Sequence, residues 1–151
     1  MAGNFNRLSL KEFIFFVIIF LFASSCAKEE QPTEIPYVYV NFSLNPNSTQ
    51  YIHLNTVNGW ETVVGGYNGI LIFRKAVSGT DAFVAFERAC PYDPLTPGAQ
   101  VVVDPGGTTC YCPVCGSKFI NTDGSCYEGP SHYPLKQYQA LYDGVLLYVS
   151  N

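Results

Sequence analysis

Cys110-Tyr-Cys112-Pro-Val-Cys115-Gly-Ser-Lys-Phe119 is the stretch that decides the fold of this chain. Its Cys112-Pro-Val-Cys115-Gly116 segment predicts a tight turn in which two sulfur atoms face a common point, as in metal-binding loops. Upstream, Cys90-Pro91-Tyr92 ends a predicted strand and opens a proline-containing loop, and downstream Gly129-Pro130 follows a predicted hairpin turn. This context strengthens the interpretation of the turn as part of a metal site.

Around this stretch the chain shows the period-two hydrophobic alternation that is typical of β-strands. Outside the N-terminus no segment has sustained helical periodicity, and many short strands favour an all-β antiparallel sandwich or barrel. The predicted strands cover residues 37–44, 51–55, 61–64, 69–74, 82–87, 100–103, 117–121, 137–142 and 145–149.

Turn sequences separate these strands and predict residues at positive φ, as tight hairpins require. They are Asn58-Gly59, Gly65-Gly66, Asn68-Gly69, Asp104-Pro105-Gly106-Gly107, Asp123-Gly124 and Asp143-Gly144.

From about Phe83 to Leu147 the chain resembles the Rieske iron-sulfur domain family. That family carries C-x-H in a first loop and C-x-x-H-G-S-x-F in a second, and Gly129-Pro130 looks like its loop that shields the cluster. The resemblance implies a Rieske-like antiparallel β domain whose two cysteine loops form a small subdomain at one end.

Transferred onto this sequence, Cys90 and Cys112 fall on the family's cysteine ligands, whereas Tyr92 and Cys115 occupy its two histidine positions. Two imidazoles raise the potential of a Rieske cluster, and a phenolate with a thiolate would lower it. An ordinary [2Fe-2S] cluster is therefore disfavoured, and the resemblance implies either no cofactor or an atypical metal site. The candidate metal ligands are Cys90, Tyr92, Cys112 and Cys115, and the candidate additional donors or disulfide partners are Cys110, Cys126 and His132.

The N-terminus predicts export. Arg7 and Lys11 precede an apolar run over residues 13–22, which is shorter than the roughly 20 apolar residues of a spanning helix. The following Ala23-Ser24-Ser25-Cys26 resembles a bacterial lipobox, so we expect a signal peptide over residues 1–25 and a lipid on Cys26. The alternative is cleavage elsewhere, which would leave Cys26 as an ordinary thiol.

The predicted anchor implies a location. Residues 26–36 are polar and should form a flexible tether, and residues 37–151 have the length of one domain. We expect an envelope protein bound to the outer membrane through Cys26. Lys28-Glu29-Glu30 is similar to surface-export signals of some Gram-negative lipoproteins, although it is also typical of a solvated linker.

Charge and cysteine content exclude some functions. Removal of the signal takes away two of eight basic and one of twelve acidic residues, which leaves a net charge of −5 and no basic stripe for nucleic acid.

A lipidated Cys26 leaves five thiols in a compartment that permits disulfides, and five cannot all pair. Either one thiol stays free, or an odd subset binds metal while two others bridge.

The signal lacks the paired arginines of the route that exports folded proteins, so a cluster would have to be acquired outside the cytoplasm. This disfavours an iron-sulfur cluster and leaves a mononuclear metal open.

Three functions are compatible with these observations. The first is a binding or assembly module for an unknown envelope partner, without an ordinary cluster, in which Cys90 and Cys112 lie close enough to cross-link. The second is an electron carrier with an atypical thiolate-rich site of Cys90, Cys112 and Cys115, with Tyr92, Cys110 or Cys126 as fourth donor.

The third is a thiol-disulfide oxidoreductase, because C-P-V-C resembles an exchange motif. In such motifs a helix N-terminus stabilises the thiolate, whereas residues 116–121 predict a strand and a turn. A non-enzymatic role is therefore favoured.

Overall fold

The computed structural model describes residues 34–151. The predicted signal peptide, the predicted lipidation site Cys26 and most of the predicted tether lie outside the described residues. Within residues 34–151 no helix has both the length and the apolar character needed to cross a membrane.

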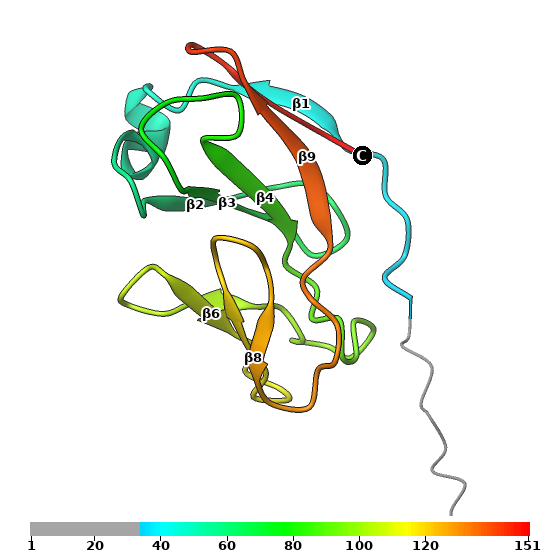
Figure 1. The fold of residues 1–151 in the computed structure, drawn as a ribbon. Helices are drawn as coiled ribbons and strands as arrows, with labels where there is room; N and C mark the ends of the chain where they lie inside the picture. Colours follow the sequence, from blue (N-terminus) through cyan, green and yellow to red (C-terminus); the bar gives the residue numbers. More distant parts are fainter. Residues whose placement is uncertain (1–33) are drawn as a thin grey trace, which may run out of the picture. The chain divides into compact units, whose positions relative to one another are not determined.

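The described chain forms two antiparallel sheets (Figure 1). The larger sheet has six strands and the smaller has four. In spatial order the larger sheet contains β1 (Asn41–Leu44), β10 (Leu147–Ser150), β9 (Gln137–Tyr142), β4 (Phe83–Glu87), β3 (Ile70–Arg74) and β2 (Trp60–Val63). The smaller sheet contains β5 (Val102–Val103), β6 (Thr109–Tyr111), β7 (Lys118–Ile120) and β8 (Cys126–Glu128). The predicted all-β antiparallel class, with a small subdomain that carries the cysteine loops, is confirmed.

Strands β3 and β4 are buried over their whole length because each of their faces packs on a different core. Ile70 and Ile72 join a first core with residues of β1, β9 and β10. Leu71 and Phe73 point to the opposite face and join a second core, which we call the interface core. Alternate side chains of a strand point to opposite faces, so one apolar run serves both cores.

The interface core joins the two sheets. Phe86 of β4 packs there with Cys110 of β6 and Phe119 of β7, all three fully buried. Gly124, at φ +75°, lies against Phe86, and a Cβ at this position would come within 2.7 Å of the ring. The small sheet is therefore held against the large one beside the cysteine loops.

One predicted strand is wrong. Residues 51–55 lie in the 3₁₀-helix η1 (Thr49–Asn55), in which Leu54 is buried and Ile52 is exposed. A Cβ at Gly59 would collide with the backbone oxygen of His53, so the turn folds back tightly on η1. Local turn contacts replace strand pairing in this segment.

The first predicted strand starts later than expected, at Asn41 instead of residue 37. Before it, the side chain of Asn151 accepts a hydrogen bond from Val40 N (3.1 Å) and donates one to Val38 O (2.7 Å). The side-chain amide of Asn151 thus makes the hydrogen bonds that a neighbouring strand would make to residues 38–40.

Strands β6 and β8 were not predicted, and β5 is shorter than the predicted strand over residues 100–103. The predicted turns adopt positive φ at Asn58, Gly65, Gly66, Gly69, Gly107, Gly124 and Gly144.

Candidate metal centre

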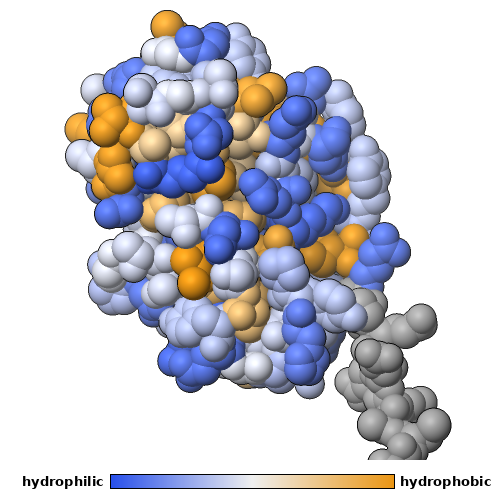
Figure 2. All heavy atoms as spheres, in the orientation of Figure 1, coloured by the Kyte–Doolittle hydropathy of each residue, from blue (hydrophilic) through white to orange (hydrophobic). Residues whose placement is uncertain are grey.

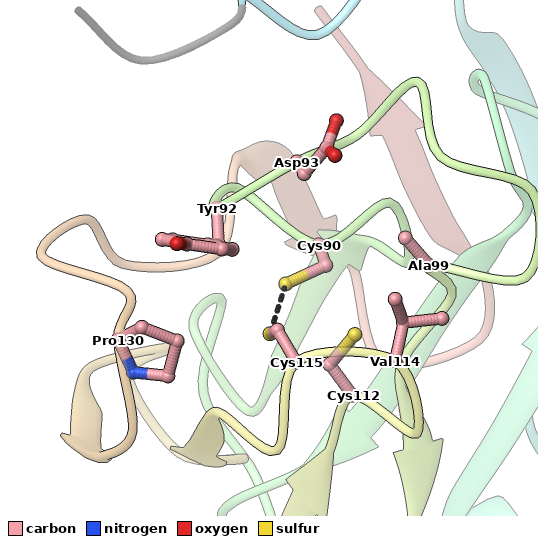
Figure 3. A pocket seen from close by; sticks show the side chains of 8 residues that line it. All are labelled: Cys90, Tyr92, Asp93, Ala99, Cys112, Val114, Cys115 and Pro130. Atoms are coloured by element: carbon pink, nitrogen blue, oxygen red, sulfur yellow. Dashed lines mark hydrogen bonds between the residues drawn. The ribbon is translucent and has the colours of Figure 1, made fainter. Parts of the chain in front are cut away.

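Three cysteines converge at one end of the small sheet. Cys90 follows β4, Cys112 follows β6, and Cys115 lies in the turn before β7. Their Sγ atoms all lie within 4.8 Å of one another, and the Sγ atoms of Cys90 and Cys115 are 3.6 Å apart (Figure 3). Two loops far apart in the sequence therefore present three sulfurs to a single point.

The turn that carries Cys112 and Cys115 is closed by the backbone. Cys112 N donates to Ser117 O at 2.8 Å, and Gly116 N donates to Cys112 O at 2.9 Å. Gly116 adopts φ +78°, which an L side chain rarely tolerates. The Cys-x-x-Cys-Gly spacing thus produces a turn that directs both sulfurs to one side.

The loop that carries Cys90 is held by its own pairing. Cys90 N donates to Ala99 O at 2.9 Å, and Ala89 forms an isolated bridge with Gln100. Within the loop, the Thr96 hydroxyl donates to the Asp93 carboxylate. The side chain of Cys90 is fully buried at the base of this loop.

The Gly129-Pro130 loop is attached to the site through Ser117. Ser131 N donates to Ser117 Oγ at 3.0 Å, and Ser117 is fully buried. Gly129 has φ +103°, and a Cβ there would lie 2.5 Å from the Ser117 Cα. Only glycine permits this close approach, which brings Pro130 to the cysteine pocket.

The thiols differ in acidity. Burial raises the pKa of Cys90 far above its ordinary value, although the Tyr92 N–H next to its sulfur acts in the opposite direction. Burial also acts to raise the pKa of Cys115, but hydrogen bonds from the Ser117 hydroxyl, the Ser117 N–H and the neighbouring thiols outweigh it and lower that pKa. Cys115 Sγ lies 3.2 Å from Ser117 Oγ. In the metal-free protein the Cys115 thiol therefore loses its proton at a lower pH than the Cys90 thiol.

A pocket of about 300 Å³ opens over the sulfurs. Besides the three cysteines it is lined by Tyr92, Asp93, Ala99, Val114 and Pro130. Tyr92 and Val114 are about half-exposed at its wall. In Figure 3 the Tyr92 ring extends toward Pro130, and its hydroxyl lies away from Cys112. All four predicted ligand positions thus reach one pocket, but only the three sulfurs face one another.

The structure does not bring Cys110 or Cys126 into this group. Both pair with Phe119 across the sheet, Cys110 from β6 and Cys126 from β8. Strand spacing puts them roughly 9–10 Å apart, beyond the reach of a disulfide. Burial raises the pKa of Cys110 to about 12, with the Asp104 charge adding to the effect. Cys110 packs in the interface core. No disulfide joins any of the five described cysteines.

The donor set does not fit a two-histidine cluster. Neither His53 nor His132 belongs to the sulfur group, and both are exposed. His53 instead lies 3.9 Å from a carboxylate oxygen of Glu61. The three sulfurs lie mutually within 4.8 Å, so they could hold a metal ion.

Two features of the site were not predicted from the sequence. Ser117 was named only within the stretch from Cys110 to Phe119, and its contacts to Cys115 and Ser131 depend on a loop that arrives from a distant part of the chain. Val114 and Ala99 line the pocket without any signal of their own in the sequence.

No family model and no curated protein matches the chain. Among solved structures, the chain is similar to the ferredoxin of carbazole 1,9a-dioxygenase from Nocardioides aromaticivorans IC177. The TM-score is 0.42 at 16% identity, over 62% of this chain and 86% of the ferredoxin. A likeness at this level decides neither the family nor the function of this chain.

Proposed function

We propose that this chain is a lipid-anchored metalloprotein of the bacterial cell envelope, in which Cys90, Cys112 and Cys115 bind one metal ion. The convergence of their three sulfurs is the observation that carries the proposal. Metal–thiolate bonds of about 2.3 Å place the sulfurs of a tetrahedral site about 3.8 Å apart. The 3.6 Å between the sulfurs of Cys90 and Cys115 is close to that value.

Iron gives this site a role as an electron carrier. Thiolate ligands select zinc, iron and copper(I), and of these iron in a thiolate site exchanges single electrons. The backbone N–H groups of Tyr92 and Ser117, which lie next to the sulfurs of Cys90 and Cys115, would tune the potential. Zinc in the same site would give a structural centre.

The envelope location rests on the predicted signal and lipidated Cys26. The chain carries the metal domain on a tether that begins at the membrane surface, where it can meet an envelope partner. The acidic mature chain is compatible with a protein or membrane partner rather than nucleic acid.

A second candidate function is a metal-free binding or assembly module. The same 3.6 Å separation of Cys90 and Cys115 favours it, because a shift of less than 2 Å would bring these sulfurs to the roughly 2.05 Å of a disulfide. Cys90 and Cys112 were predicted as the cross-linking pair, whereas the thiol–thiol contact in the structure joins Cys90 and Cys115.

Metal and thiol analysis distinguishes the two functions. The mature protein is purified without oxygen and analysed for metals, acid-labile sulfide and disulfides. We expect one metal ion per chain, no sulfide, and three thiols at 90, 112 and 115 that alkylate only after a chelator removes the metal. A metal-free protein with a Cys90–Cys115 disulfide would favour the binding module. Two irons with two sulfides would contradict both proposals.

A further inference from the structure

Three sulfurs leave one corner of a tetrahedral site unfilled. Among residues 34–151, no fourth Cys, His, Asp or Glu side chain joins Cys90, Cys112 and Cys115 within 4.8 Å. Structural zinc sites are closed by four protein ligands, whereas sites that work on exogenous ligands keep one position open. The donor count therefore matches an open site.

Within residues 34–151 the other candidate donors lie away from this corner. Cys110 and Cys126 belong to a cross-strand row through Phe119 and lie outside the group. Tyr92 is 43% exposed, and its hydroxyl lies on the Pro130 side of the pocket, away from Cys112 (Figure 3). The phenol forms a wall of the pocket instead of completing the ligand set.

We propose that the fourth coordination position opens into the pocket and accepts a neutral, monodentate donor from outside the chain, of the imidazole type. This inference rests on the proposed metal site and names the class of ligand that the site takes. The donor could be a small molecule or the side chain of a partner, which share the same chemistry.

Charge selects a neutral donor. Three thiolates around a divalent ion leave a net charge of −1 at the centre. A further anion would meet repulsion from this charge in a partly desolvated space. A neutral ligand adds no charge to the centre.

The pocket also suits a small flat ring. Its volume of about 300 Å³ exceeds what a water molecule needs, and Ala99, Val114, Pro130 and the Tyr92 ring add apolar surface to a lining that is mixed in polarity. The apolar part of this lining can contact an aromatic ring while the ring nitrogen reaches the metal.

Cobalt(II) tests the proposal, because its visible bands report coordination number and donor type. The reduced mature protein is loaded with one equivalent of cobalt and titrated with imidazole and, separately, with azide. We expect saturable shifts of the cobalt bands with imidazole, at concentrations at least tenfold lower than with azide. No change with imidazole in fully loaded protein, or tighter binding of azide, would overturn the open neutral site.

Failure of the metal site itself looks different. If cobalt does not bind at one equivalent with intense thiolate-to-cobalt charge transfer, then the proposed function fails before any imidazole is added. If cobalt binds normally but imidazole has no effect, then only the open position fails.

A tyrosine variant tests the remaining internal donor. In Tyr92→Phe we expect the cobalt spectrum before titration to match that of the unchanged protein. The matched control is Tyr127→Phe, since Tyr127 is similarly exposed at 51% and does not line the pocket. A spectral change in Tyr92→Phe that is absent in Tyr127→Phe would identify the phenol as fourth ligand and overturn the proposal.

Discussion

Cys115 is the residue whose surroundings distinguish the three thiols of the site. Its pKa is lowered because hydrogen bonds from Ser117 and the neighbouring thiols outweigh its burial, whereas burial raises the pKa of Cys90. In the metal-free protein Cys115 therefore ionises at a lower pH than Cys90.

Alkylation with iodoacetamide over a pH series checks this order. We expect Cys115 to be labelled at lower pH than Cys90, and Cys110 to stay unlabelled until the protein unfolds. Peptide mass spectrometry locates the label. Labelling of Cys90 before Cys115 would show that the assigned hydrogen bonds do not stabilise the Cys115 thiolate. Metal binding displaces protons from thiols, so metal affinity should rise with pH through this range.

Ser117 is the residue that connects the Cys112–Cys115 turn to the Gly129-Pro130 loop. Its hydroxyl accepts from Ser131 N at 3.0 Å and lies 3.2 Å from Cys115 Sγ. Ser117→Ala leaves the buried Ser131 N–H without a partner, which costs about 1–3 kcal/mol of unfolding free energy. Urea denaturation of the reduced, metal-free protein measures this loss.

The matched control for that change is Ser125→Ala. The Ser125 hydroxyl donates to Asp123 in a surface turn, where water can replace it. We expect a loss below about 0.5 kcal/mol in the control. Equal losses of unfolding free energy in the two variants would mean that the Ser117 hydrogen bonds stabilise the fold no more than a surface hydrogen bond does.

Strand β4 shows how an element positions the site. It ends at Glu87, whose fully buried carboxylate accepts from Tyr67 N (2.6 Å), Asn68 N (2.8 Å), Ala89 N (3.0 Å) and the Tyr138 hydroxyl (2.7 Å). Burial and this carboxylate raise the pKa of Tyr138. Glu87 thus ties the turn after β2, the start of the Cys90 loop and β9 to one point.

Glu87→Gln should destabilise the fold strongly. The amide replaces one carboxylate oxygen, which accepts two of the four bonds, with an NH2 group, and it removes the charge that strengthens the remaining bonds, so we expect a loss of about 3 kcal/mol. Tyr138→Phe removes only one of the four bonds and should cost about 1 kcal/mol. The same urea experiment compares them, and a Glu87→Gln loss no larger than that of Tyr138→Phe would refute this role.

At the scale of elements, sequence patterns were most informative where burial is complete. The apolar runs of β3 and β4 predicted strands correctly because both faces of each are covered. Residues 51–55 were predicted wrongly because their composition is compatible with a strand, while contacts around Gly59 favour a 3₁₀-helix. Strands β6 and β8 have three residues each, too few to show a period.

The candidate site was predictable only in part. The meeting of Cys90, Cys112 and Cys115 followed from a resemblance to a family, because nothing local links residue 90 to residue 112. The direction of the Tyr92 hydroxyl and the separation of Cys110 from Cys126 depend on loop geometry and strand register. These features decide the ligand count and could not be read from the sequence.

At the scale of the whole molecule, the two sheets pack through the interface core and leave the sulfur pocket open at one edge. On the face drawn in Figure 2, hydrophobic residues form small groups separated by hydrophilic ones, so no broad apolar surface dominates this face. Attachment to the membrane is expected from the predicted lipid on Cys26.

Fractionation of cells tests that attachment. The unchanged protein should sediment with membranes and label with a radioactive fatty acid, whereas Cys26→Ser should not carry the label. Cys126→Ser serves as the control, because it removes a thiol outside the predicted lipobox. Lipid label that persists in Cys26→Ser would contradict the predicted anchor.

X-ray absorption at the metal edge tests the central claim most directly, on anaerobically purified protein with its bound metal. The account predicts about three sulfur neighbours at about 2.3 Å, one lighter neighbour, and no second metal nearby. Cys112→Ser should lose a sulfur neighbour or the metal, while Cys126→Ser should leave the spectrum unchanged. A short metal–metal distance with bridging sulfide, or fewer than three sulfur neighbours in the unchanged protein, would contradict a mononuclear site of Cys90, Cys112 and Cys115.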